Sequence, residues 1–458
     1  MDVAAELADH VAALRFESFS AELVPKIRAF TLSTLAGALA GTAVAGSQPI
    51  VEVFAELSGK RESTVLGLPV RVAAPEAALL NAMYAQAADF DDIHDRALVR
   101  PFSIAVPAAL AMAERIGGVS GRDFITAISA AVDVTVRLGL AAPLTTLRWA
   151  RPSTLGTFGA AVAAAKLLGL DGARTLDALG IAYSQAAGTT QAMKDGAVIK
   201  RVQPGFAARA GVTSAILAEH GVTGPANALE GQNGYFNMYE GGRYERSRIT
   251  ERLGTYNYAA EVAFKPYPCA AEVHGVLDAT LALVREHTIV ADDVRAIRIQ
   301  VPPLVQDLGG RPYPPANGSV VGAALASVRY GAATAIVNGE VGLRNYSQAA
   351  VVDPRTLALV ELTEVESAPV TGAQYFTPAT VEITTTARQT FRKTVTTVHG
   401  HADDPLEWPE IVDKFRACAT SAMPPIDSAR QDSVIERVDA LEELPDVGDI
   451  ARLLAPTA

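Results

Sequence analysis

The sequence predicts a mainly α protein, with a large all-helical domain and a smaller α+β domain that holds an antiparallel sheet. Alanine and leucine are abundant and aromatic residues make up only 6% of the chain, a composition that favours helices. Apolar residues recur at helical spacing through residues 3–45. Strict alternation of apolar and polar residues begins only after residue 265. A chain of 458 residues is too long for one small core, so two domains are expected.

Residues 1–264 are predicted to form the all-helical domain. Beyond residue 45, helices are expected at 75–87, 103–116, 121–138, 154–172, 171–188 and 203–221. The segment 154–172 is dense in small residues, so neighbouring helices are expected to approach it closely. Gly169 and Gly172 are expected to end that helix.

Residues 265–400 are predicted to form the α+β domain. Helices are expected at 269–286 and 322–338, and strands at 294–301, 379–387 and 391–398, with the last two paired as a hairpin. This order favours a small antiparallel sheet with helices on one face. The tail, residues 401–458, is predicted to be helical from 408 to 456.

Composition limits the classes of partner and location. A net charge of -11 argues against nucleic acid or an anionic membrane surface as a partner. The two cysteines, Cys269 and Cys418, form neither a disulfide framework nor a metal cluster, and are expected to be buried reduced thiols in a cytoplasmic protein. The N-terminus lacks the basic region of a secretory signal, and no clean span of about 20 apolar residues predicts a transmembrane helix.

The most informative segment is residues 265–274, KPYPCAAEVH. Its two prolines make a rigid turn that holds Lys265 beside aromatic residues, and His274 follows nine residues later. A lysine fixed in this way is a candidate for binding an anionic ligand or, once desolvated, for proton transfer. The alternative is an ordinary loop before a helix.

Three other blocks carry candidate site residues. Residues 81–107 crowd Asp89, Asp92 and His94 into one acidic loop, residues 199–211 begin with Ile-Lys-Arg, and residues 322–339 contain Tyr330. The acidic loop is alternatively a solvated turn that caps the following helix. A metal site is not expected there, since oxygen ligands would have to converge from several segments. A tyrosine on a helix is alternatively a packed core residue.

These four blocks, in this order, resemble the MmgE/PrpD family, which includes 2-methylcitrate dehydratase, cis-aconitate decarboxylase and iminodisuccinate epimerase. The resemblance covers nearly the whole chain. It implies that the tail returns to the helical domain, so that the smaller domain is an insertion. It also implies a homodimer formed through the helical domain and a reaction that needs no cofactor. A cleft between two such domains is a usual place for a ligand.

The resemblance also implies the site residues. Asp89 matches the first aspartate of the family signature, Lys200 and Lys265 match active-site lysines, and Tyr330 and His274 match a tyrosine and a histidine common in the family. The catalytic candidates are Lys200, Lys265, Tyr330, His274, His94 and Asp89. The substrate-binding candidates are Arg100, Arg151, Asp92 and Arg201.

At two positions the sequence departs from its relatives. Decarboxylases and dehydratases of the family usually carry His-Pro where this chain has Arg100-Pro101 and Arg151-Pro152. An arginine, with a pKa above about 12, cannot exchange protons near pH 7, but it can clamp a carboxylate with two hydrogen bonds. The alternative is that both arginines belong to salt bridges in misaligned loops.

The resulting hypothesis is a cofactor-independent enzyme that moves the proton α to a carboxylate of a small polycarboxylate. An epimerase of the iminodisuccinate type is the first choice, because it tolerates the loss of two histidines better than dehydration does. A dehydratase or decarboxylase of the 2-methylcitrate or cis-aconitate type is the alternative. A non-catalytic homodimer that binds carboxylates is the third hypothesis.

Overall fold

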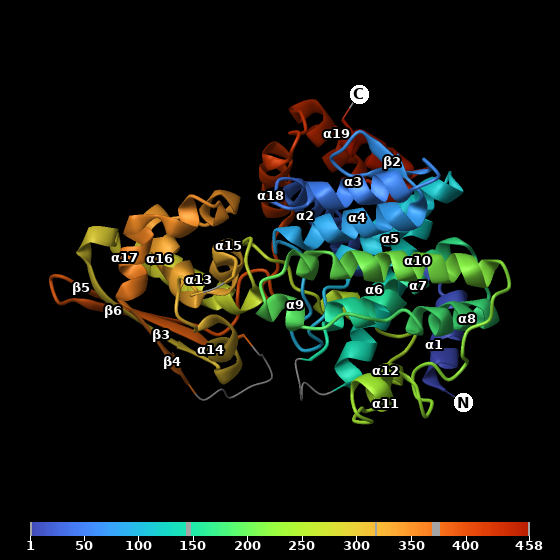
Figure 1. Ribbon diagram of the computed structural model, residues 1–458, viewed down its shortest axis with the longest axis horizontal. Helices are drawn as coiled ribbons and strands as arrows, with labels where there is room; N and C mark the ends of the chain where they lie inside the picture. The colour runs from blue at the N-terminus through green and yellow to red at the C-terminus, as the bar shows by residue number, and fades with distance from the viewer. Residues whose placement is uncertain (1, 143–147, 317, 369–375, 457–458) are drawn as a thin grey trace.

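The computed structural model, which describes residues 2–142, 148–316, 318–368 and 376–456, has two hydrophobic cores. The larger core takes its residues from Val3 to Phe264 and from Leu406 to Leu454. The smaller core lies almost entirely between Ala263 and Ile383. The two corresponding units lie side by side along the longest axis of the molecule (Figure 1). The predicted fold class, mainly helical with a small sheet in the C-terminal part, is confirmed.

The larger unit is built mainly from helices. They are α1 (Val3–Ala13), α2 (Leu23–Thr42), α3 (Gln48–Leu57), α4 (Ala74–Ala87), α5 (Phe102–Ile116), α6 (Gly121–Ala141), α7 (Arg151–Leu167), α8 (Gly172–Tyr183), α9 (Gln191–Lys194), α10 (Gln203–Glu219), α11 (Tyr235–Tyr239) and α12 (Ser247–Thr250), with short 3-10 segments η1 (Phe16–Ser18), η2 (Val198–Arg201) and η3 (Tyr258–Glu261). The small residues of α7 allow close packing. A Cβ added to Gly211 of α10 would lie only 2.5 Å from the backbone nitrogen of Ala161.

One hairpin interrupts this helical unit. Strands β1 (Ser63–Val65) and β2 (Val70–Val72) pair antiparallel between α3 and α4. The expectation of an all-helical domain is wrong at this point. Strands of three residues are too short to produce a readable alternation of apolar and polar side chains.

The smaller unit packs helices against a four-stranded sheet. Its elements are α13 (Ala271–His287), η4 (Ala291–Asp293), β3 (Val294–Val301), α14 (Pro303–Gly309), α15 (Val320–Ala326), α16 (Val328–Asn338), η5 (Leu343–Tyr346), η6 (Ala350–Val352), α17 (Pro354–Glu361), β4 (Thr363–Ser367), β5 (Ala379–Thr385) and β6 (Thr390–Val395). The sheet order is β4-β3-β5-β6. Alternate residues of β5 are buried, and α13, α16 and α17 lie on one side of the sheet (Figure 1).

The sheet is mixed, and this corrects the expectation of a purely antiparallel one. β4 runs parallel to β3, whereas the β3–β5 and β5–β6 pairs are antiparallel. Helices α14 to α17 lie between β3 and β4 in the chain and act as the crossover that a parallel pair requires. The segment 363–367, Thr-Glu-Val-Glu-Ser, is mostly polar and gave no strand signal.

The helix expected at 322–338 is two helices. The backbone of Ser327 is extended between α15 and α16, and the two helix axes differ by 87°. The Ser327 hydroxyl accepts a hydrogen bond from the backbone N–H of Tyr330 at 3.2 Å, so Ser327 caps the second helix. Helical periodicity alone could not show this break.

The C-terminal segment packs against the larger unit. Its elements are α18 (Trp408–Ser421), α19 (Ser428–Asp439), η7 (Leu441–Glu443) and α20 (Gly448–Leu454). α18 lies against α2, beside the smaller unit, in both ribbon views. Its buried residues, Ile411, Lys414, Phe415, Cys418 and Ala419, face this packing.

Helix α6 is long and apolar enough to cross a membrane, contrary to the expectation that no such segment exists. However, 94% of its apolar window is buried inside the protein, as in the core helix of a folded domain. Its burial among the other helices explains its composition.

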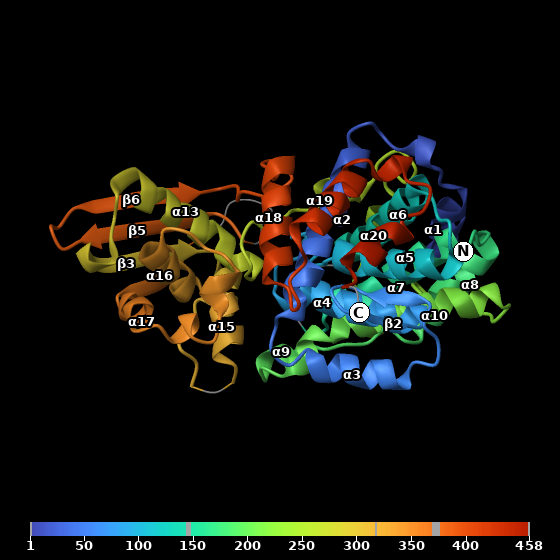
Figure 2. The same cartoon turned by 90° about the horizontal axis from the view of Figure 1, so that it is seen from above.

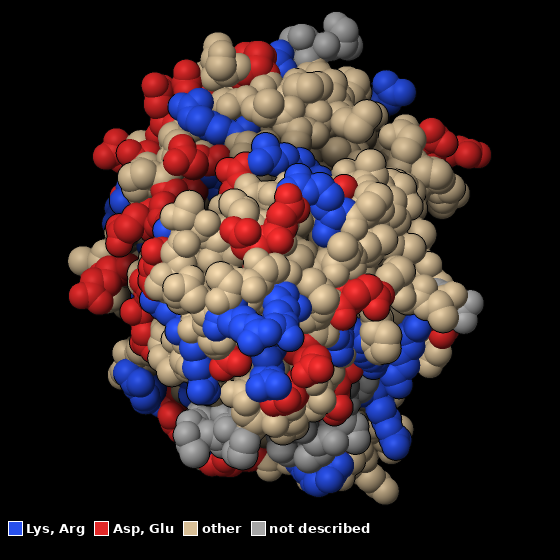
Figure 3. Space-filling view, turned by 90° about the vertical axis from the view of Figure 1, so that its left-hand side faces the viewer, with Lys and Arg blue, Asp and Glu red and all other residues tan. Residues whose placement is uncertain are grey.

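Charge is mixed on the end of the molecule formed by the smaller unit. Lys, Arg, Asp and Glu side chains are interspersed across this face (Figure 3). On the sheet, Arg298 lies 3.6 Å from Glu366 and within ion-pair distance of Glu382. The described residues of this face therefore mix both signs of charge, whereas a phosphate backbone binds to an extended basic surface.

Candidate active site

The turn after α4 places the first carboxylate of the site. Asp89 adopts the left-handed backbone region, with a φ of 53°, and its N–H donates to the carbonyl of Gln86 at 3.1 Å. Asp tolerates this conformation better than most residues, although it is uncommon outside glycine. The side chain of Asp89 is buried.

Three cationic side chains from three segments converge on Asp89. Nη1 of Arg100 lies 2.6 Å and Nζ of Lys265 lies 3.1 Å from Oδ1, while Nζ of Lys200 lies 3.0 Å from Oδ2. Arg100 precedes α5, Lys200 lies in η2 and Lys265 precedes α13. The side chain of Lys265 is only 1% exposed, whereas that of Lys200 is 37% exposed. Solvent reaches this cluster from the side of Lys200.

These contacts fix the charge of the cluster. Burial alone would raise the pKa of the Asp89 carboxyl, but the charges of Arg100, Lys200 and Lys265 outweigh burial and hold that pKa well below its usual value. Burial likewise acts to lower the pKa of Arg100, yet Asp89 and Asp91 raise it above its usual value. Asp89 is therefore an anion and Arg100 a cation at neutral pH.

The loop that carries Lys265 is held in place by a neighbouring glycine. The N–H of Phe264 donates to the carbonyl of Gly400 at 2.7 Å. Gly400 has a φ of 95°, and a Cβ at this position would lie 2.5 Å from the carbonyl oxygen of Phe264. Only glycine satisfies both conditions without strain. The residue next to Lys265 is thus fixed by close backbone contact.

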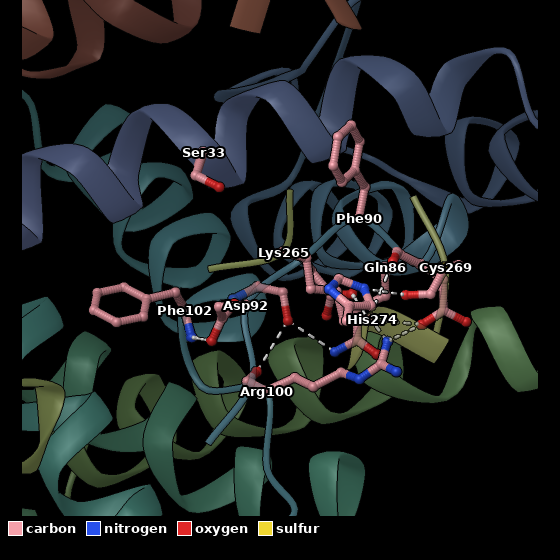
Figure 4. Close-up of polar contacts among 12 residues, drawn as sticks. Ser33, Gln86, Phe90, Asp92, Arg100, Phe102, Lys265, Cys269 and His274 are labelled. Carbon is pink, nitrogen blue, oxygen red and sulfur yellow. Dashed lines mark hydrogen bonds and ion pairs between the residues drawn. The ribbon is translucent and has the colours of Figure 1, made fainter. Parts of the chain in front are cut away.

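Asp92 serves as a helix cap. Its two carboxylate oxygens accept hydrogen bonds from the backbone N–H groups of Phe102 and Ser103, each at 3.0 Å, at the start of α5 (Figure 4). Burial, followed by the charge of Asp91, raises the pKa of Asp92 to about 7. Asp92 therefore belongs to the acidic loop and also caps α5. In the structure its partners are backbone groups, so it remains a substrate-binding candidate only as a prediction.

The two histidine candidates have different surroundings. Nδ1 of His94 accepts the N–H of Ala97 at 3.2 Å, so the neutral ring carries its hydrogen on Nε2, 3.6 Å from Oε2 of Glu261. His274 is buried near Lys265, with Nε2 3.4 Å from the carbonyl oxygen of Cys269 (Figure 4). Burial, with the charge of Lys265, lowers the pKa of His274 to about 3. His274 is therefore neutral at pH 7.

Three predicted residues lie outside the cluster around Asp89. Nη2 of Arg151, at the start of α7, lies 3.1 Å from Glu240, which matches the salt-bridge alternative. Arg201 donates to the carbonyl of Ala45 at 3.0 Å. The hydroxyl of Tyr330 donates to the carbonyl of Asn345 inside the smaller core. The side chains of Arg151, Arg201 and Tyr330 would have to move toward the cluster before they could bind a substrate or take part in catalysis there.

Both parts of the chain match models of one protein family. Residues 5–247 match the MmgE/PrpD N-terminal domain, and residues 267–440 match the MmgE/PrpD C-terminal domain. The chain belongs to the MmgE/PrpD family. The family expected from the four sequence blocks is confirmed.

Curated relatives of this MmgE/PrpD protein carry related names. It is 28% identical over 479 residues to a cis-aconitate decarboxylase-like protein of Aspergillus oryzae, covering 99% of this chain and 97% of the relative. It is also 28% identical to the cis-aconitate decarboxylase of Homo sapiens, covering 94% of this chain and 90% of the relative. A cis-aconitate decarboxylase of Aspergillus terreus is 30% identical over 62% of this chain and 61% of its own length.

The cluster draws on the N-terminal matched region of the MmgE/PrpD protein and on the segment that joins it to the C-terminal one. Asp89, Arg100 and Lys200 lie in the N-terminal match, and Lys265 lies in the short segment between the two matches. His274 belongs to the C-terminal match. The cluster therefore forms where the two family domains join, so relative movement of the domains would alter it.

Sequence reasoning missed three charged residues near this junction. Oδ1 of Asp91 lies 2.9 Å from Nη1 of Arg100, and Oδ2 has no hydrogen-bond partner among the described residues. Burial, together with the charge of Asp89, raises the pKa of Glu272, at the start of α13. Lys414 of α18 is buried against both site segments. Only Asp91 had a signal, its place in the acidic block.

Metal binding finds no support in the arrangement of the described side chains. Within residues 2–142, 148–316, 318–368 and 376–456, no group of three or more His, Cys, Asp and Glu side chains could hold a metal ion. The carboxylates of the cluster are instead matched with Arg100, Lys200 and Lys265.

Proposed function

We propose that this protein is a cofactor-independent lyase that acts on a small polycarboxylate, with decarboxylation of cis-aconitate or a close analogue as its reaction. The observation that carries the proposal is the convergence of Arg100, Lys200 and Lys265 on one buried carboxylate. Relatives that align over nearly the whole chain are named cis-aconitate decarboxylases. These names support the lyase alternative better than the epimerase that the sequence put first.

The cations supply the binding site for substrate carboxylates. In the present structure Asp89 pairs with all three, as a substrate carboxylate could. Arg100 and Lys265 are largely buried, so their attraction for an anion is weakly screened by solvent. A substrate carboxylate would enter from the exposed side of Lys200 and share the cations with Asp89.

The same cations suit the charge that decarboxylation produces. The bond between one carboxylate carbon and the carbon skeleton breaks, carbon dioxide leaves, and the electron pair stays on the skeleton. Conjugation spreads this charge toward a remaining carboxylate, where Arg100 and Lys265 would stabilise it. One proton must then replace the carbon dioxide.

Lys200 is our choice of proton donor. Asp89 is the only hydrogen-bond partner of its ammonium within the part of the chain that the structure describes, so the side chain can turn toward a substrate. Lys265 has contacts with both the backbone oxygen and the carboxylate of Asp89, which fix it in place. His274 is neutral at pH 7 and so is a poorer acid than a lysine ammonium ion at this site. Water returns the proton to Lys200 after turnover.

Proton NMR of the purified protein in deuterated water tests the proposal. The substrates are cis-aconitate, citrate, 2-methylcitrate and iminodisuccinate, and a Lys265→Met protein prepared in the same way is the control for contaminating activity. Conversion of cis-aconitate to a decarboxylated product that carries one solvent deuteron supports the proposal. Stabilisation of the protein by these anions without any turnover would instead indicate a non-catalytic binder.

An epimerase of the iminodisuccinate type is the second candidate, and one observation favours it. Arg100 occupies a position where relatives that act as decarboxylases or dehydratases usually carry histidine, and it is held by both Asp89 and Asp91. It cannot exchange protons near pH 7. Deuterium at the α-carbon of iminodisuccinate, without loss of water or carbon dioxide, would favour this reaction.

A further inference from the structure

Lys414 is a buried lysine on the C-terminal helix α18, far in sequence from the site. Its Nζ donates to the hydroxyl of Ser33 at 3.0 Å, to the carbonyl oxygen of Phe90 at 2.8 Å and to that of Lys265 at 3.0 Å. Nζ also lies 4.0 Å from the centre of the Phe90 ring. An ammonium group has three N–H bonds, and here three acceptors match them.

Two of these three acceptors belong to the segments that form the site. Phe90 directly follows Asp89, and the carbonyl of Lys265 belongs to the site lysine itself. These segments lie 176 residues apart and meet side chain to side chain through the contact of Lys265 with Asp89. Lys414 joins the same two segments through their backbone carbonyls.

Helix packing alone does not explain a lysine at this position. The other buried residues of α18 include Ile411, Phe415 and Cys418, which form an apolar face. Burying an ammonium ion in such a face is costly unless hydrogen bonds compensate. An apolar residue would pack there without that cost, so the lysine is explained by the acceptors it reaches.

We infer that Lys414 is a positioning residue of the active site, whose ammonium holds the Asp89–Phe90 turn and the Lys265 loop at a fixed separation. The catalytic part of this inference rests on the proposed function. The structural part does not, because it concerns the order of two backbone segments. Loss of the ammonium would let Lys265 shift relative to Asp89, and a displacement of about 1 Å costs on the order of 100-fold in rate.

The surroundings make this contact sensitive to pH. Burial lowers the pKa of Lys414 to about 8, and the neighbouring charged or titratable groups are Cys418, Asp91, Lys265 and Asp92. From helix α2 the hydroxyl of Ser33 accepts a hydrogen bond from Nζ, and Asp432 of α19 pairs with Arg416 rather than with Lys414. A neutral amine has only two N–H bonds, so one of the three acceptors would lose its hydrogen bond. Activity is therefore expected to fall as the pH rises through about 8.

The test compares Lys414→Met, Lys414→Arg and the control Phe415→Leu, which perturbs packing of the same helix without removing a polar contact. Lys414→Met is expected to lose about 10- to 100-fold in kcat, with a smaller change in KM, while Phe415→Leu lowers only the Tm. Lys414→Arg keeps its charge, so its activity is expected to exceed that of Lys414→Met and to lose the decline near pH 8. A Lys414→Met protein with wild-type kcat and pH profile would overturn the inference.

A second readout does not depend on turnover. Hydrogen–deuterium exchange of Lys414→Met should quicken in peptides that cover residues 86–92 and 262–268, and remain at wild-type rates there in Phe415→Leu. If the wild type turns over none of the four acids, the proposed function fails, while this exchange result still decides the role of Lys414.

If Lys414→Met does not fold, the pH profiles of the wild type and of Lys414→Arg decide. A fall in activity that Lys414→Arg shows only at higher pH than the wild type supports the inference, and identical profiles refute it.

Discussion

At the scale of single residues, the site is organised around a carboxylate in an unfavourable backbone position. Asp89 has a φ of 53° and lies two residues after α4 ends, where the negative end of the helix dipole disfavours an anion. Three cations at 2.6 to 3.1 Å outweigh this cost. Such strain is maintained where surrounding contacts determine it, and it is common at functional sites.

Replacing Asp89 with asparagine should therefore destabilise the protein. Arg100, Lys200 and Lys265 would lose the counter-charge that they share, although Asp91 still pairs with Arg100, and breaking a buried ion pair typically costs about 3–5 kcal/mol. The folded-state pKa of Asp89 is below its unfolded value, so this stabilisation is fully present above about pH 4 and is lost as the pH falls further. Urea unfolding of both proteins should show a difference at pH 7 that shrinks below pH 4. A constant difference would contradict the ion cluster.

The two site lysines should differ in their kinetic effects. Lys265→Met removes a buried cation that stabilises developing charge, and we expect kcat/KM to fall by about 100- to 1,000-fold. Lys200→Met removes the proposed proton donor, so its loss should appear mainly in kcat. Steady-state kinetics on the substrate identified by NMR would measure both. Lys194→Met, an exposed lysine six residues before Lys200, is the matched control and should retain wild-type activity.

Much of the site could be predicted from local sequence. Lys265, Asp89, Lys200 and Arg100 stand in unusual blocks, and the structure brings all of them together. Lys414 could not be found in this way, because a lysine in an amphipathic helix normally reads as part of the solvent-facing side. Its burial depends on contacts with residues more than 140 positions away.

At the scale of elements, the strands with alternating sequence and the longer helices were predictable. Strand β4 and the helix break at Ser327, which the sequence did not predict, were missed for the same reason. Strand β4 is polar because much of it is exposed, so its sequence lacks alternation. The break at Ser327 depends on a cap, which periodicity does not report. The exposure of β4 and the break at Ser327 both depend on tertiary packing of the smaller unit, and a local sequence pattern carries no information on that packing.

Gly400 gives an element-scale prediction, because it connects the segment before α18 to the loop of Lys265. Gly400→Ala would place a Cβ 2.5 Å from the carbonyl oxygen of Phe264 at a φ of 95°. We expect a loss of about 1–3 kcal/mol in unfolding free energy and lower activity, because Lys265 must shift. Gly241→Ala is the control: its φ is also positive, at 65°, but nothing lies within 4 Å of the added Cβ. Equal activity losses in both variants would refute the link to Lys265.

At the scale of the whole molecule, one side of the larger unit exposes apolar side chains. Leu57 of α3 is 72% exposed, and Val53, Ile199 of η2 and Phe206 of α10 are each at least 41% exposed. The rings of Phe54 and Phe206 lie 6.4 Å apart, so α3 and α10 are neighbours, and Figure 2 places α3, α9 and α10 along the same edge of the larger unit. Contiguous apolar surface of this kind is typical of an interface.

The homodimer implied by the family resemblance remains a prediction, and this surface offers a way to test it. Lys200 directly follows Ile199, so a second copy seated here would lie next to the exposed side of the cation cluster. Light scattering should give a mass near twice 47.9 kDa for the wild type. Leu57→Asp should give the monomer with an unchanged fold, because Leu57 is exposed within one chain. Met238→Asp, 58% exposed on α11, should leave the mass unchanged. A monomeric wild type, or a Leu57→Asp protein that stays dimeric, would exclude this surface as the interface.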